Sequence, residues 1–123
     1  MKRVVAAFPG TCGELFQGTL DGVQCLVSCP VDRMARLELL LEEGEGISVP
    51  PEMSKTRRAL ELALARRPLP GALRVRRLEA LPEGKGYASS TADILAALYG
   101  FAQLSGTPLP PEEASRIALA VEP

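Results

Sequence analysis

The residues best suited to chemistry lie in one glycine-rich segment, residues 82–93, with the sequence PEGKGYASSTAD. Gly84 and Gly86 can adopt backbone conformations that other residues resist, and they let the chain approach a ligand closely. Lys85 places a positive charge between the two glycines, so the spacing differs from the P-loop pattern G-x-x-x-x-G-K-[ST]. The segment nevertheless has the composition of a loop that cradles phosphate groups.

Three hydroxyl side chains follow the glycines at the expected start of a helix, namely Ser89, Ser90 and Thr91. The free N–H groups and the dipole at a helix N-terminus attract anions. The hydroxyl groups can also bond phosphate oxygens or help to hold Mg²⁺. An alternative interpretation needs no ligand, because Ser90-x-x-Asp93 is also a capping box. We expect Asp93 to cap the helix rather than bind metal, since a carboxylate so close to phosphates would repel them.

The composition excludes several other kinds of site. Fourteen Lys and Arg against 15 Asp and Glu give a net charge of -1, whereas nucleic-acid-binding domains usually carry a strong basic excess. The absence of histidine excludes catalysis and metal binding by that side chain. We expect no membrane span, because no apolar run approaches about 20 residues. Three cysteines without an export signal predict reduced thiols and a cytoplasmic location.

The elements that must position these residues follow the order strands, helix, strand, helix, helix. Pro9 and Gly10 are expected to end a first strand, and Asp21-Gly22 predicts a hairpin turn. The expected strands cover residues 4–8, 14–19, 23–29, 34–41, 47–49 and 72–78. The expected helices cover residues 54–66, with Ser54 as the N-cap, then 89–104 and about 110–121. This order predicts an α+β fold in one domain, residues 1–123.

Residues 82–92 resemble the phosphate loop of the GHMP kinases, P-x-x-x-G-[LM]-[GAS]-S-S-[AST]-A. Tyr87 departs from the usual Leu or Met of that pattern. A second segment, residues 9–18 (PGTCGELFQG), occupies the place of the family's first motif, with Thr11 where many members have Lys. The matching positions of the phosphate loop are Pro82, Gly86, Ala88, Ser89, Ser90, Thr91 and Ala92.

Together the two segments resemble the L-threonine kinase branch of that family, which serves cobalamin synthesis. The resemblance implies transfer of phosphate from ATP to free L-threonine, giving O-phospho-L-threonine. It spans nearly all of this chain but only the N-terminal half of a typical member. The closing residues 121–123 (VEP) resemble the start of the branch's E-P-[ST]-D-G segment. We therefore expect an N-terminal ATP-binding domain over residues 1–123, without the C-terminal domain and inactive by itself.

The resemblance also implies a ribosomal S5 domain 2-like α+β fold, with ATP and Mg²⁺ as cofactors. It assigns Ser90 and Lys85 to catalysis, and Ser90 and Glu122 to the metal. Threonine is expected to contact Thr11, Glu14 and Gln17. The expected ATP phosphate-binding residues are Gly84, Lys85, Gly86, Tyr87, Ala88, Ser89, Ser90 and Thr91.

Three alternatives remain open from the sequence. The chain could belong to another small-molecule GHMP kinase, such as a homoserine or diphosphocytidyl-methylerythritol kinase. It could be a non-catalytic fragment that binds nucleotide without turnover. It could also be a nucleic-acid-binding domain, since the S5-like fold occurs in such proteins, although the balanced charge and 4% aromatic content argue against this. The sequence gives no indication of oligomeric state.

Overall fold

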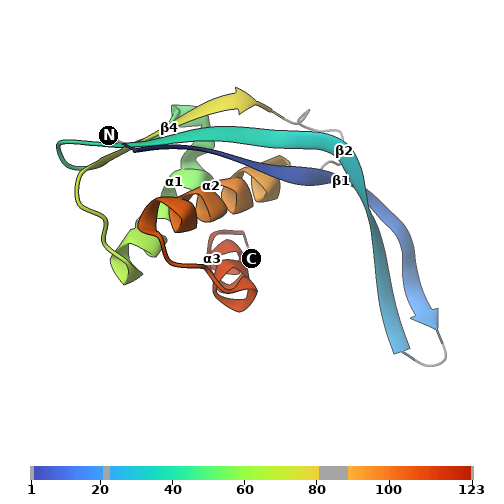
Figure 1. The fold of residues 1–123 in the computed structure, drawn as a ribbon. Coiled ribbons are helices and arrows are strands. Elements are labelled where there is room, and N and C mark those ends of the chain that lie inside the picture. Colours follow the sequence, from blue (N-terminus) through green and yellow to red (C-terminus); the bar gives the residue numbers. More distant parts are fainter. Residues whose placement is uncertain (1, 21–22, 81–88, 123) are drawn as a thin grey trace.

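The computed structural model describes residues 2–20, 23–80 and 89–122, and the side chains of residues 2–9, 34–80 and 90–122. A four-stranded mixed sheet has the order β1-β2-β4-β3. Its strands are β1 (Lys2–Leu20), β2 (Val23–Glu42), β3 (Ile47–Ser48) and β4 (Ala72–Glu79). β2 pairs antiparallel with both β1 and β4, whereas β3 pairs parallel with β4. Figure 1 shows β1 and β2 continuing past the helices as a bent two-stranded arm.

The expectation that Pro9 and Gly10 end the first strand is wrong. β1 runs through both residues, with Pro9 opposite Met34 and the pairing becoming irregular just beyond. An edge strand tolerates proline because a missing N–H on its open side breaks no ladder hydrogen bond. β2 is likewise continuous where two strands were expected. Leu20 pairs with Val23 on either side of the predicted turn, whose residues Asp21 and Gly22 lie outside the described part of the chain.

Three helices cover one face of the sheet (Figure 1). They are α1 (Ser54–Arg66), α2 (Ser89–Ser105) and α3 (Pro111–Val121), all close to their predicted limits. The expectation that Ser54 caps α1 is wrong. Met53 is the N-cap, at the end of a short 3-10 turn (Pro51–Met53), and Ser54 is the first helical residue. Pro111 begins α3 at a position where its missing N–H costs nothing.

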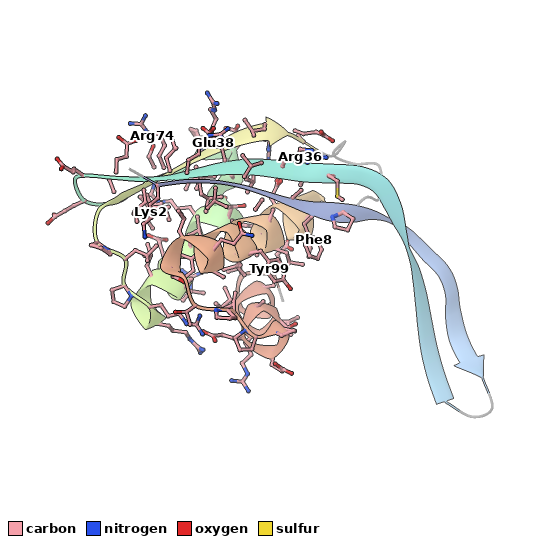
Figure 2. All side chains as sticks on the ribbon, in the orientation of Figure 1. Lys2, Phe8, Arg36, Glu38, Arg74 and Tyr99 are labelled. Atoms are coloured by element: carbon pink, nitrogen blue, oxygen red, sulfur yellow. The ribbon has the colours of Figure 1, made fainter. Side chains whose placement is uncertain are left out.

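The core lies between the sheet and α2. Gly100 lets this helix lie close to β2, because a Cβ atom there would stand 2.8 Å from Leu39 Cδ1. Phe8 and Tyr99 stack at the edge of this layer, with ring centroids 5.8 Å apart (Figure 2). The largest fully buried side chains are Phe101, Leu37, Leu39, Leu60, Ile94, Leu98 and Thr56. Among the described residues, no helix is long and apolar enough to cross a membrane.

The face of the sheet away from the helices carries charged side chains, including Arg36, Glu38 and Arg74 (Figure 2). Glu38 is only 5% exposed although it lies on this open face. Arg3 Nε lies 2.5 Å from one of its carboxylate oxygens, and an Arg76 nitrogen lies 3.3 Å from the other. The two arginines come from β1 and β4, so Glu38 in β2 connects three strands and is covered by its ion partners.

Candidate functional site

The predicted metal ligands Ser90 and Glu122 are in contact. Ser90 lies in the first turn of α2, and its hydroxyl donates a hydrogen bond to Glu122 Oε2. The neighbouring Thr91 Oγ1 donates to the other oxygen, Glu122 Oε1, at 2.6 Å. The chain thus brings together residues about 30 positions apart in the sequence. The contact also joins the start of α2 to the end of α3.

α3 holds Glu122 in this position. Ala114 and Ile117 are buried and fix the helix against the core. Glu122 follows the last helical residue, and its backbone N–H donates to the Ala118 carbonyl at 2.8 Å. Its side chain is 19% exposed, so the carboxylate is partly shielded from water where it meets α2.

Lys55 is the third described side chain that donates to the Glu122 carboxylate. It lies in the first turn of α1, and its Nζ donates to Glu122 Oε2 at 3.0 Å. Burial alone would raise the pKa of Glu122. Hydrogen bonds from Ser90, Thr91 and Lys55, together with the Lys55 charge, outweigh burial and lower that pKa below its ordinary value. The carboxylate is therefore ionised at neutral pH.

A pocket of about 170 Å³ adjoins this cluster, lined by residues 52–56 with Arg77, Ser90 and Asp93. An Arg77 guanidinium nitrogen donates to Asp93 Oδ2 at 2.6 Å, which joins β4 to the first turns of α2. The side chains are 22% and 7% exposed respectively. Asp93 therefore has an ion partner that its expected capping role did not include.

Sequence reasoning missed Lys55 and Arg77. Lys55 gave no local signal, because its partner Glu122 is 67 residues away. Arg77 did give one: Leu73 and Val75 are buried on the helix-facing side of β4, and side chains alternate along a strand. Continuing that alternation puts Arg77 on the same face, where a cation needs an acidic partner.

The contacting groups are chemically suited to Mg²⁺. Magnesium prefers oxygen ligands and is usually held by one or two carboxylates, with water and substrate phosphates completing its shell. Ser90, Thr91 and Glu122 offer two hydroxyl oxygens and one ionised carboxylate. Within the described ranges no three acidic or cysteine side chains gather into a metal cluster. The side chains of Ser90, Thr91 and Glu122 therefore suit a Mg²⁺ ion that takes most of its ligands from water and from the phosphates of its substrate.

The other predicted site residues cannot be placed as side chains. Thr11, Glu14 and Gln17 lie on β1, opposite Pro30, Ser28 and Leu26 of β2, but their side chains lie outside the described set. Ser89 is described only as the first residue of α2. The remaining phosphate-loop residues, Gly84, Lys85, Gly86, Tyr87 and Ala88, lie outside the described ranges.

A larger hollow, about 670 Å³, lies elsewhere on the molecule. It is lined by Lys2, residues 41–44 and 68–71, Leu104 and Ser105, at the far end of α2 from Ser90. None of these residues belongs to the hydroxyl and carboxylate cluster. The larger hollow is therefore not the one that adjoins the hydroxyl and carboxylate cluster.

Comparison with known proteins identifies the family. The protein family described as "GHMP kinases N terminal domain" matches residues 54–123 of this chain. The chain is 34% identical to an L-threonine kinase of Salmonella typhimurium and 32% identical to an L-threonine kinase of Citrobacter freundii. Each alignment covers 97% of this chain, and the chain spans 40% and 41% of those two relatives.

The fold agrees with this match. The crystal structure of homoserine kinase from Cytophaga hutchinsonii superposes with a TM-score of 0.73 at 16% sequence identity. The superposition covers 98% of this chain and 41% of that structure. It confirms the predicted α+β fold of a GHMP kinase N-terminal domain. With more than half of its residues matched by the family description and a kinase fold throughout, the chain belongs to the GHMP kinase family.

Proposed function

We propose that residues 1–123 form the ATP-binding N-terminal domain of a kinase that phosphorylates the hydroxyl group of L-threonine. The product is O-phospho-L-threonine, for use in cobalamin synthesis. The observation that carries the proposal is the meeting of Ser90, Thr91 and Glu122 at the start of α2. The two relatives named L-threonine kinase support the choice of acceptor.

In this proposal the chain contributes position and charge. The Ser90 hydroxyl and the Glu122 carboxylate hold the cation, and the N-terminus of α2 attracts the phosphates. Lys85 and the backbone of residues 84–89 contact the phosphates. When bound, Mg²⁺ neutralises the charge of the ATP phosphates. Phosphoryl transfer depends mainly on alignment and electrostatic stabilisation, so these roles account for most of the expected rate.

The amino-acid substrate is expected to bind beside the arm formed by β1 and β2. Glu14 and Gln17 are assigned to its ammonium and carboxylate groups, and Thr11 to a further contact with the substrate. The substrate hydroxyl oxygen then forms a bond to the γ-phosphorus while the bond from that phosphorus to the β,γ-bridging oxygen breaks in line; ADP leaves and the hydroxyl proton is released to water. A panel of hydroxyl acceptors tests this assignment, with ADP formation as the readout. If homoserine were phosphorylated faster than threonine, homoserine would replace threonine as the proposed acceptor.

Ser90→Ala tests the metal role directly. We expect threonine-dependent ADP formation to fall about a hundredfold in the full-length gene product, as when one preorganised polar contact is lost. Ser105→Ala is a matched control, because this serine lies in the last turn of the same helix and bonds the Ala102 carbonyl. The control should retain turnover, and both variants should unfold within a few degrees of the parent. Unchanged turnover in Ser90→Ala rejects the role.

A second candidate function is nucleotide binding without turnover by the 123-residue chain itself. It is favoured by one observation, that the chain spans only about two fifths of its curated relatives. Calorimetry with Mg²⁺-ATP beside a threonine assay on the same preparation separates the two functions. We expect heat of binding and no threonine-dependent turnover, and rapid turnover by the 123-residue chain excludes this second candidate.

A further inference from the structure

The Glu122 carboxylate is already occupied by a cation from the protein itself. Lys55 Nζ lies 3.0 Å from Oε2, and this same oxygen accepts the hydrogen bond from Ser90. The other oxygen accepts from Thr91. Each carboxylate oxygen therefore has a donor within the chain, and the ammonium group sits on the oxygen next to the Ser90 hydroxyl.

A divalent cation held by Ser90 and Glu122 would compete with this ammonium group. Both would be attracted to Oε2, and two cations a few ångströms apart repel each other strongly in a partly shielded site. Glu122 is 19% exposed, so water screens the repulsion only in part. Either the metal stays away from Oε2 or Lys55 leaves it.

Lys55 is able to leave. Its side chain is 55% exposed, and it ends a flexible four-carbon stem on the first turn of α1. It also lines the 170 Å³ pocket that contains Ser90, so it has space to turn without unpacking the core. A partly exposed ion pair of this kind is weak enough to exchange partners.

We propose that Lys55 is a displaceable internal cation that holds Glu122 in place and suppresses binding of free metal. The divalent cation then binds well only together with a nucleotide, whose phosphates provide a new counter-charge for the released ammonium group. This inference rests on the proposed function, in which Ser90 and Glu122 hold Mg²⁺. It adds to that function the expectation that metal and nucleotide bind together, as one complex.

Manganese provides the test, because it broadens the NMR signals of nearby amides. The isotope-labelled chain is titrated with Mn²⁺ alone, and the midpoint of broadening is read at Ser90, Thr91 and Glu122. Lys55→Met should lower the midpoint about two- to fivefold, the range expected for loss of one partly exposed charge pair. Lys55→Arg keeps the cation and should leave the midpoint within about twofold of the parent.

Arg58→Met is the matched control, since it removes one exposed positive charge from the same helix. It should not lower the midpoint, which separates a local effect from a change in net charge. A second titration adds a non-hydrolysable ATP analogue. The analogue should tighten Mn²⁺ binding more in the parent than in Lys55→Met, because only the parent must displace an ammonium group.

Glu122→Gln separates failure of this inference from failure of the proposed function. If that change leaves the Mn²⁺ midpoint unaltered, the metal assignment itself is wrong. If Glu122→Gln raises the midpoint but Lys55→Met raises it or leaves it unchanged, the metal assignment stands and the role of Lys55 as a competing cation is rejected. The amide spectra report in the same samples whether each variant is folded.

Discussion

Replacing Arg77 with methionine removes the guanidinium that lies 2.6 Å from the Asp93 carboxylate. Methionine keeps most of the length of the side chain, so the main loss is charge and hydrogen bonding rather than volume. Asp93 is one turn beyond Ser90 in α2, and its side chain is 7% exposed. We therefore expect the substitution to destabilise the junction between β4 and the beginning of α2.

The size of the effect follows from burial. Exposed ion pairs contribute about 0–1 kcal/mol, whereas removing one partner of a fully buried pair costs about 3–5 kcal/mol. Arg77 is 22% exposed, so this pair lies between the two limits. We expect Arg77→Met to lower the free energy of unfolding by about 2–3 kcal/mol. At this chain length each kcal/mol corresponds to about 3–5 °C in the melting temperature.

Urea unfolding followed by circular dichroism measures the change, and a double-mutant cycle with Asp93→Asn isolates the pairwise part. We expect a coupling energy of at least about 1 kcal/mol. Arg36→Met is the control, because Arg36 and Glu79 form a comparable pair at 3.2 Å with both side chains about half exposed. That variant should lose less than about 1 kcal/mol. Equal losses in Arg36→Met and Arg77→Met, or a coupling energy near zero, would refute the reasoning from burial.

Two further predictions concern Gly71 and Glu122. Gly71→Ala should destabilise the chain by about 2 kcal/mol or more, because φ is +116° and the new Cβ would lie 2.4 Å from the Glu42 carbonyl oxygen. Gly46→Ala, at φ +94°, should cost about half as much in the same urea assay, because no heavy atom of the described residues other than its chain neighbours lies within 4 Å of the new Cβ. Equal losses would contradict the steric argument. The lowered pKa of Glu122 adds stability that is present above its ordinary value of 4.5 and is lost as pH falls through the folded-state pKa. The stability difference between the parent and Glu122→Gln should therefore shrink below about pH 4.5, and a difference that is constant from pH 7 to 3 would contradict this.

Local patterns predicted the elements well where local physics decides them. Pro111 with two acidic residues marks the start of α3, and the apolar spacing from Ala59 to Ala63 marks α1. The pattern misled at Pro9, because the cost of proline in a strand depends on whether that strand lies at an edge. Whether a strand lies at an edge is decided by the order of strands in the sheet, and no local window contains that information.

In the candidate site, too, local patterns predicted some features and tertiary packing decided the others. Ser90, Thr91 and Glu122 were predicted individually from motifs that resemble a known family. Their contact depends on α3 packing back against α2, which is a tertiary event. Lys55 belongs to a third helix and carries no motif, so only the packed structure reveals that it reaches Glu122. The structure shows that Ser90, Thr91 and Glu122 are in contact. Their roles in binding metal and phosphate remain predictions, as do the roles of Thr11, Glu14, Gln17 and the phosphate loop.

Glu38 has a consequence for how the strands align during folding. Side chains alternate between the faces of a strand, so a slip of β2 by one residue would turn Glu38 toward the helices and expose Leu37 and Leu39 to water. A charged carboxylate among apolar side chains, separated from Arg3 and Arg76, is costly. The slipped sheet is therefore destabilised in two ways, by the buried carboxylate and by the exposed leucines. A single acidic residue on the open face thus favours the correct register of three strands.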